Sequence, residues 1–167
     1  MINPTRLYRI YHHLYASGIR FVPGGLSRLN YFLTGCYLPP DCIIGKRVRF
    51  QHFGSGVVLH NRVTIGNDVM IMPNVTIGQS VKVGNEVAPL DRVVVEDNVM
   101  IGAGARIIAS GTLTVGEGSA IGANAVLTTS IPPGSTAVGI PARVVSRDPN
   151  LDPSNTIDSQ SSRDERD

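Results

Sequence analysis

VVLHNR VTIGND VMIMPN VTIGQS, residues 57–80, repeats every six residues: an aliphatic residue recurs in each group and a small residue, usually Gly, tends to follow it. The pattern resumes at residue 93 as VVVEDN VMIGAG ARIIAS and, one inserted glycine later, as TLTVGE GSAIGA NAVLTT. Such periodicity decides the architecture and is read first. The recurring positions are Leu59, Ile65, Ile71, Ile77, Val95, Ile101, Ile107, Val115, Ile121 and Leu127.

A repeat of six residues fits a short strand followed by a tight corner. Three such sides return the chain above itself after eighteen residues and stack the aliphatic side chains inside a prism. Gly and Asn tolerate the positive φ that tight corners need, and Gly66-Asn67, Gly78 and Gly116 stand where corners are expected. A β-sandwich would instead show turn signals every eight to twelve residues. The sequence therefore predicts an all-β solenoid, a parallel β-helix.

Three zones divide the 167 residues. Residues 1–35 show helical spacing of apolar residues, broken at Gly18 and again at Pro23-Gly24-Gly25, and predict a short helical cap over one end of the solenoid. Residues 36–145 form the repeat zone. Residues 146–167 are polar, with few large apolar residues, and predict a disordered tail.

The net charge of +2 is too small to indicate nucleic-acid binding. Residues 1–50 are nevertheless basic, which fits either solvated helix faces, the commoner case, or contact with an anionic membrane or a phosphorylated acceptor. Neither a signal peptide nor an apolar run long enough to span a bilayer is visible. We expect a cytoplasmic protein, with the inner face of the membrane as an option, and reduced thiols at Cys36 and Cys42 rather than a metal or redox site.

The repeat zone, residues 36–145, resembles the hexapeptide-repeat acyltransferases, which include serine, sugar and antibiotic O-acetyltransferases. The resemblance implies a left-handed coil, a homotrimer, and acetyl-CoA as the acyl donor in a groove between neighbouring subunits. It implies no metal. The expected chemistry lies where the repeat is interrupted: at residues 51–56, at residues 79–92, which form either a loop or an imperfect coil, and at the inserted Gly111.

His52 is the candidate catalytic residue. An alcohol is a poor nucleophile at neutral pH, and imidazole is suited to remove its proton. The segment QHFGSG, residues 51–56, resembles the DHATG-type motif of the serine acetyltransferase branch, in which the His is the general base. His60, at an expected corner, is a weaker candidate to replace or assist it.

Coenzyme A contacts are expected from the same resemblance. STAVGIPARVV, residues 135–145, resembles the family's TAxGxPAR ending, and small residues in IGAGA and IGAN would let the pantetheine arm lie close to the backbone. Arg143 either approaches a coenzyme phosphate or is a surface residue closing the last coil. The expected cofactor contacts are Gly78, Ala103, Ala123, Gly139, Pro141 and Arg143.

Serine acetyltransferases usually carry an acidic residue before the first hexads, an Asp before the catalytic His, and a His in the loop. This chain has Tyr37 and Gln51 in the first two positions and no His in the third. Because a serine site must pair an ammonium and a carboxylate, and because the Cys-x-x-Pro-Pro segment at residues 36–40 resembles exopolysaccharide acetyltransferases, we expect a sugar or polysaccharide hydroxyl as the acceptor. Expected acceptor contacts are Gln51, Tyr37 and Arg92, with Glu86 as an acid that could orient His52.

Two alternatives stay open. One is a serine O-acetyltransferase with a rearranged amino-acid site. The other is a catalytically silent scaffold or a zinc protein similar to the γ-carbonic anhydrases, although the latter needs three converging histidines and the repeat zone offers only His52 and His60.

Overall fold

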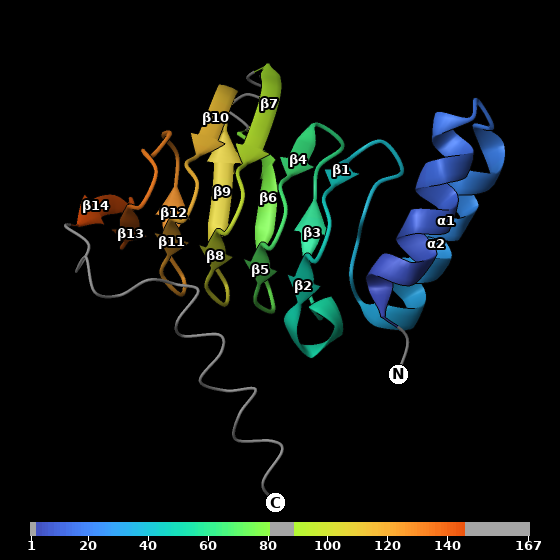
Figure 1. The fold of residues 1–167 in the computed structure, drawn as a ribbon, viewed down its shortest axis with the longest axis horizontal. Coiled ribbons are helices and arrows are strands. Elements are labelled where there is room, and N and C mark those ends of the chain that lie inside the picture. Colours follow the sequence, from blue (N-terminus) through green and yellow to red (C-terminus); the bar gives the residue numbers. More distant parts are fainter. Residues whose placement is uncertain (1–2, 81–88, 146–167) are drawn as a thin grey trace, which may run out of the picture.

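The computed structural model describes residues 3–80 and 89–145, which form an elongated solenoid with two helices across its amino-terminal end (Figure 1). The helices are α1 (Pro4–Ala16), α2 (Phe21–Thr34) and the short 3-10 helix η1 (Gln51–Gly54). The strands are β1 (Ile43–Ile44), β2 (Arg49–Phe50), β3 (Val58–Leu59), β4 (Val63–Ile65), β5 (Met70–Ile71), β6 (Thr76–Gln79), β7 (Leu90–Val95), β8 (Met100–Ile101), β9 (Arg106–Ala109), β10 (Gly111–Val115), β11 (Ala120–Ile121), β12 (Val126–Leu127), β13 (Thr136–Val138) and β14 (Arg143–Val145).

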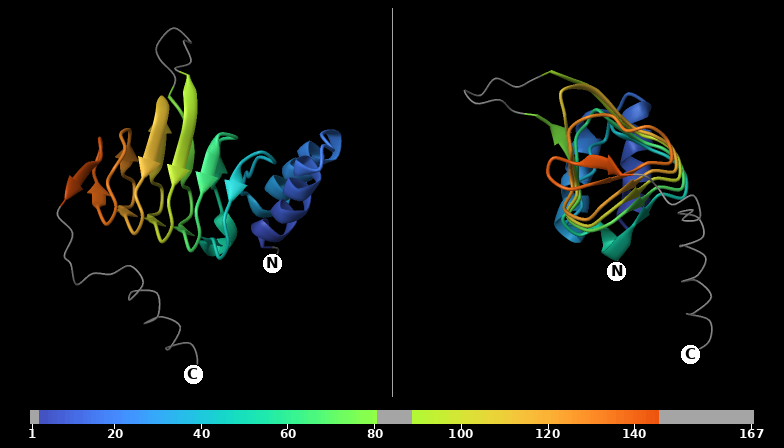
Figure 2. Two further views of the ribbon diagram at one scale, coloured as in Figure 1. Left: turned by 45° about the horizontal axis from the view of Figure 1, so that its top comes forward. Right: turned by 90° about the vertical axis from the view of Figure 1, so that its left-hand side faces the viewer.

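Three sheets form the sides of the solenoid, in the orders β1-β4-β7-β10, β14-β13-β11-β8-β5-β2 and β12-β9-β6-β3. Their strands pair in parallel, and among the described strands β14 alone runs antiparallel, against β13. The view along the axis in Figure 2 shows the coils superimposed around a common centre. The predicted all-β solenoid is therefore confirmed.

The register between strands measures the length of each coil. β3 pairs with β6 at an interval of eighteen residues, as three six-residue sides require. Three other intervals are longer. In them, Arg49 of β2 pairs with Met70 of β5, Met70 pairs with Met100 of β8, and Met100 pairs with Ala120 of β11. The last interval exceeds eighteen by two residues, so the prediction of a single inserted residue is wrong. Gly111, with φ of 69°, sits where the register shifts.

No complete coil is inserted between β6 and β7. β4 pairs directly with β7, and β6 pairs directly with β9, so the chain re-enters the solenoid one level above the point where it left. Of the two expectations for residues 79–92, the imperfect coil is wrong. Residues 81–88 lie outside the described part of the chain.

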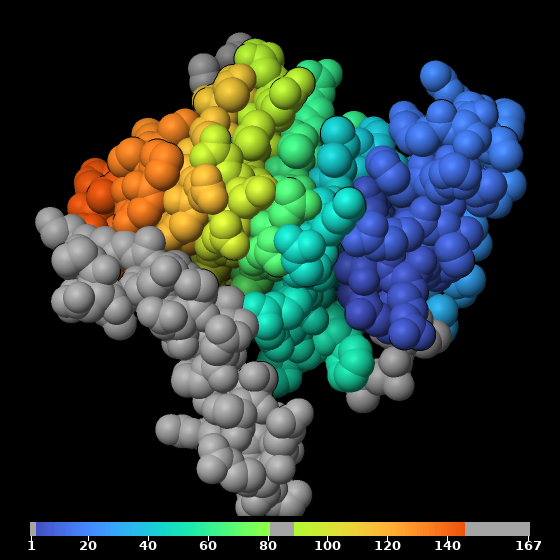
Figure 3. Space-filling view, viewed as in Figure 1, coloured from blue at the N-terminus to red at the C-terminus, as the bar shows by residue number. Residues whose placement is uncertain are grey.

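The core consists of the aliphatic residues that the repeat predicts. They occupy two stacked positions in each hexad and shield one another from water along the axis. The space-filling view shows the coils in contact along the length of the solenoid (Figure 3). Buried members include Leu59, Val63, Ile65, Val69, Ile71, Val75, Ile77, Val95, Ile101, Ile107, Val115, Ile121 and Leu127.

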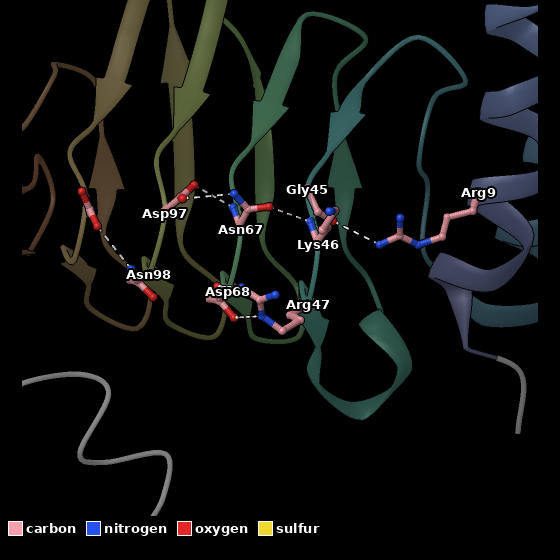
Figure 4. A network of polar contacts seen from close by, with 9 residues as sticks. Arg9, Gly45, Lys46, Arg47, Asn67, Asp68, Asp97 and Asn98 are labelled. Carbon is pink, nitrogen blue, oxygen red and sulfur yellow. Dashed lines mark hydrogen bonds and ion pairs between the residues drawn. The ribbon is translucent and has the colours of Figure 1, made fainter.

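One row of corners is joined by hydrogen bonds that run from coil to coil (Figure 4). The carboxylate of Asp97 accepts from the Asn67 backbone N–H at 2.8 Å, and the Asn67 side chain accepts from the Lys46 N–H at 2.9 Å. Gly66 is required here by close approach rather than by positive φ, because a Cβ would stand 2.3 Å from an Asp97 oxygen. Positive φ instead falls on other corner residues, among them Asp68, Asn74, Asn98 and Asn124.

The helical cap is fastened to the first coil by buried hydroxyl groups. The Tyr8 hydroxyl donates to the carbonyl of Cys42 at 2.6 Å, and the Tyr11 and Ser27 hydroxyls both donate to the carbonyl of Leu38 at 2.8 Å. These bonds satisfy carbonyl groups that the solenoid leaves open at its end. Burial raises the pKa of the Tyr8 hydroxyl well above its ordinary value.

The break expected at Pro23-Gly24-Gly25 does not occur. Residues 17–20 separate the helices, and α2 runs through the Pro-Gly-Gly sequence. Pro23 lies in the first turn of α2, where no backbone N–H is needed and proline is tolerated. No helix in residues 3–80 or 89–145 is long and apolar enough to cross a bilayer. The predicted tail, residues 146–167, lies outside the described residues.

Candidate active site

His52 stands on a loop that leaves the solenoid between β2 and β3. Phe50 pairs with Ile71 and Val58 pairs with Thr76, so eight residues on the lower coil span what five residues span on the next. The three extra residues fall between Phe50 and Val58, in the segment that contains the corner turn η1. His52 and Phe53 have φ of 48° and 59°, a left-handed conformation that non-glycine residues rarely adopt. His52 is exposed, so this interruption presents its imidazole outside the packed prism.

The loop is held at both sides. The Gly56 N–H donates to the carbonyl of Gly35 at 3.1 Å, and the Ser55 N–H donates to the carbonyl of His52 at 3.3 Å. Gly54 is buried, with φ of 70°. These constraints fix the backbone that carries His52, which suits a residue that must meet a reacting group in a defined geometry.

A groove begins on the coil next to this loop and follows the corners towards the carboxyl end. We call it the corner groove; its volume is about 520 Å³, and Asn74, Ala103, Gly104, Arg106, Ala123, Asn124, Val126 and Ile140 line it. The Asn74 N–H donates to the carbonyl of Ser55 at 2.9 Å, which joins the groove to the His52 loop. The floor is shallow because small residues occupy the corners.

A second groove, the side groove, has a volume of about 510 Å³ and lies over the ends of β3 and β6. Its polar residues are Tyr37, Asp41, His60, Asn61 and Thr76. The Nδ1 atom of His60 accepts from the Arg62 N–H at 3.2 Å, so in the neutral ring the proton is on Nε2. On β9, the Arg106 side chain donates to the Thr76 hydroxyl at 3.0 Å and spans from the corner groove to the side groove.

The structure brings only some of the expected residues together. Ala103 and Ala123 line the corner groove, whereas Tyr37 and Gly78 line the side groove. Gln51 is half-buried beside His52 in η1. Gly139 and Pro141 flank Ile140, which lines the corner groove.

Two expected residues lie elsewhere on this chain. Arg92 is exposed on β7, in a different sheet from both grooves, and Arg143 is exposed on β14, where it donates to the carbonyl of Ala142 at 3.2 Å. Neither lines a groove. Glu86 lies outside the described residues.

Sequence reasoning missed Asn74, Asn124, Arg106 and Asp41. The recurrence of Asn at expected corners was a usable signal for Asn74 and Asn124. Arg106 offered none, because its place beside Thr76 depends on a pairing thirty residues apart.

The cysteines are not part of either groove. Cys36 and Cys42 are buried and unpaired, and burial raises the pKa of each thiol to about 12. Such thiols are uncharged at neutral pH. Within residues 3–80 and 89–145, no three His, Cys, Asp or Glu side chains gather in an arrangement that could hold a metal ion.

Comparison with curated proteins returns serine acetyltransferases. The chain is 38% identical over 138 residues to that of Bacillus subtilis (strain 168), and 37% identical over 147 residues to that of Helicobacter pylori (strain J99 / ATCC 700824). These alignments cover 83% and 88% of this chain. The chain spans 60% of the Bacillus protein and 82% of the Helicobacter protein. No protein-family model matches the chain.

Solved structures give the same answer. A soybean serine acetyltransferase apoenzyme superimposes with a TM-score of 0.76 at 35% identity, covering 85% of this chain and 56% of that one. A serine acetyltransferase in complex with cysteine gives 0.79 at 33% identity, covering 92% and 57%, and one in complex with CoA gives 0.73 at 32%, covering 85% and 55%. These matches confirm the left-handed β-helix.

The relatives contradict the expected sugar or polysaccharide acceptor and favour the serine alternative. The expectation was wrong because it read missing acids at fixed offsets from the repeat as a site without acids. Asp41, four residues after Tyr37, lies in the same groove as Tyr37. A fold of this kind can bring a carboxylate to a site from a neighbouring position. With 37% identity over 82% of the Helicobacter protein, this chain belongs to the serine acetyltransferase family.

Proposed function

We propose that the protein transfers an acetyl group from acetyl-CoA to the hydroxyl of serine. The observation that carries the proposal is the combination of family membership with an exposed histidine on an anchored loop that is hydrogen-bonded to the corner groove through Ser55 and Asn74. The curated relatives bear the name serine acetyltransferase, and a solved relative is a complex with CoA.

His52 acts as the general base. Its imidazole takes the proton from the serine hydroxyl as the oxygen attacks the thioester carbonyl, and a C–O bond forms. The tetrahedral intermediate then collapses, the C–S bond breaks, and the imidazolium returns the proton to the departing thiolate. The products are O-acetylserine and CoA. Any rotation of the loop that moves His52 away from the groove would cost turnover.

Acetyl-CoA lies along the corner groove. Ala103, Gly104 and Ala123 keep the floor low, so that the pantetheine arm can reach backbone groups. A side chain at Gly104 is disfavoured, because φ is 70° and a Cβ would stand 2.2 Å from the Asn124 side-chain oxygen, which would have to move. Towards the carboxyl end, Gly139 and Pro141 shape the rim, and Arg143 contacts a coenzyme phosphate. Gly78 lines the route on the neighbouring side groove.

The groove is open along its outer side on a single chain, and we propose that three chains close it by packing side by side. In such a trimer a residue remote from the grooves of its own chain can serve those of a neighbour. Arg92 is a proposed contact of this kind, whereas Gln51 and Tyr37 contact serine from the same chain as His52. Glu86 is the proposed acid that orients the His52 ring.

The test is an assay of the purified protein with acetyl-CoA and L-serine, following CoA thiol release and detecting O-acetylserine by mass spectrometry. His52→Ala should lower kcat by about 10²- to 10⁴-fold, the usual contribution of a general base. His13→Ala, an exposed histidine on α1, is the matched control and should retain full activity. Full activity of His52→Ala would overturn the mechanism, and no turnover of serine by the wild type would overturn the function.

A further inference from the structure

Helix α2 buries two polar residues and exposes several large apolar ones. Ser27 and Asn30 are buried, and Asn30 donates to the carbonyl of Pro4 at 3.2 Å. By contrast, Phe21 is 97% exposed and Phe32 is 85% exposed. A helix packed on a water-soluble protein normally shows the opposite arrangement. The outward side of α2 therefore lacks a partner among the described residues.

The exposed residues form one continuous surface. Phe21, Gly25, Arg28, Leu29 and Phe32 each lie three or four residues from another member of the set, which places them along one side of the helix. We call this set the outer stripe. It lies opposite Pro23, Ser27 and Asn30, which face inward. Val22 and Leu33, both about half exposed, border it.

The charge around the outer stripe has a single sign. Residues 1–40 contain four arginines and neither Asp nor Glu. Arg28 belongs to the stripe and Arg20 immediately precedes Phe21, whereas Arg9 donates to the carbonyl of Gly45 at 3.2 Å. Exposed Phe and Leu beside arginine are the composition of helices that lie in the interface of anionic membranes.

We propose that the outer stripe docks the protein on an anionic lipid surface, with Phe21, Leu29 and Phe32 inserted among the head groups. The charges favour this occupant over a second copy of the chain. In a two-fold pairing of two outer stripes, Arg28 of one copy would lie near Arg28 of the other, and residues 1–40 hold no acidic residue to neutralise them. Lipid phosphates neutralise the arginines and accept the aromatic rings at the same time.

Docking through α2 places the solenoid on the membrane by its amino-terminal end. Figure 1 shows both helices across that end and β14 at the opposite end. The His52 loop joins β2 to β3, the strands at the cap end of their sheets, so acetyl transfer would take place close to the surface. The inference does not depend on serine being the acceptor.

Co-sedimentation with lipid vesicles tests the proposal. The full chain should bind vesicles of phosphatidylcholine with phosphatidylglycerol and bind pure phosphatidylcholine at least tenfold more weakly. Phe21→Asp and Phe32→Asp should each lose binding to the anionic vesicles by at least tenfold, because each removes an inserted ring and adds a repelled charge. Arg28→Gln should weaken binding to the anionic vesicles and so reduce the difference in affinity between anionic and pure phosphatidylcholine vesicles.

Val144→Asp is the matched control: Val144 is 50% exposed on β14 at the far end of the solenoid. This variant should bind like the wild type. Since Phe21 and Phe32 are exposed, their replacement should leave the thermal midpoint unchanged. Vesicle binding that is absent, or equal in the wild type and both Phe variants, overturns the proposal. Self-association without lipid that the Phe variants abolish also overturns it, in favour of a second copy.

Discussion

Gly54 lies with its backbone against the side chain of Cys36. A Cβ at position 54 would stand 2.8 Å from the sulfur and 3.3 Å from the Cβ of Phe50, and Gly54 has φ of 70°. Cys36 is fully buried where the helical cap meets the solenoid. This contact sets how closely the loop that carries His52 approaches the helical cap.

Gly54→Ala should therefore damage both stability and catalysis. A left-handed conformation costs a non-glycine residue about 1–2 kcal/mol, and the clash with the sulfur adds to it. We expect the free energy of unfolding in urea to fall by about 2 kcal/mol or more and kcat to fall more than tenfold, because the loop must shift. The measurements are urea unfolding and the serine acetylation assay.

Gly24→Ala is the control for this change. Gly24 lies in α2, where a Cβ would meet no atom within 4 Å, so the helix should gain about 0.5–1 kcal/mol. Adding Cys36→Ala to Gly54→Ala should recover part of the lost activity by removing the sulfur. A Gly54→Ala variant with unchanged stability and kcat would show that the contact does not position the loop.

The corner groove can be filled without disturbing the core. Ala123 is exposed on the groove, so Ala123→Leu should raise the KM for acetyl-CoA by about tenfold or more while kcat at saturation stays near the wild-type value. Ala16→Leu, the same exchange at an exposed position on α1, should leave both constants unchanged. A KM unaffected by Ala123→Leu would mean that the coenzyme does not lie in this groove.

The solenoid was predictable because every six-residue group must place an aliphatic side chain in the core. Positions such as Ile65, Ile71 and Ile77 must meet inside the prism, so one residue type recurs at one spacing. His52 was predictable for the opposite reason: its loop is where that spacing fails. The two-residue insertion near Gly111 was missed, because the apolar pattern of β10 continues through it and a shift of register is visible only in the pairing.

The polar lining of the side groove could not be predicted from residues at fixed offsets. Asp41 reaches the side groove because Tyr37 pairs with Val58 as an isolated bridge before the first coil closes, which brings the segment after it over β3 and β6. Arg106 reaches Thr76 across thirty residues of sequence. Both placements follow from the stacking of coils and have no counterpart in local sequence spacing.

The hydroxyl of Tyr8 gives a test of how the cap is attached. Tyr8→Phe removes the donor to the buried Cys42 carbonyl and should cost about 1–3 kcal/mol of unfolding free energy, the usual penalty for an unsatisfied buried group. Tyr15→Phe, on the half-buried side of the same helix, should change stability by about 0.5 kcal/mol or less. Equal losses in the two variants, measured by urea unfolding, would mean that the hydroxyl bond does not fasten the cap.

The corner hydrogen bonds should make stability fall in acid. Bonds from the Asn67 backbone and side chain hold the pKa of Asp97 below its ordinary value. A lowered pKa in the folded state contributes stability above the ordinary pKa, and this contribution is lost as the pH falls below the ordinary pKa and through the lowered folded value. Asp97→Asn should therefore be less stable than the wild type at neutral pH, and this difference in unfolding free energy should shrink as the pH falls.

Asn67→Ala keeps the Asp97 carboxylate but removes one of its donors. In this variant, the stability that Asp97 contributes should therefore be lost at a higher pH than in the wild type. Parallel stability curves for the wild type and Asp97→Asn would show that these bonds do not couple proton binding to folding.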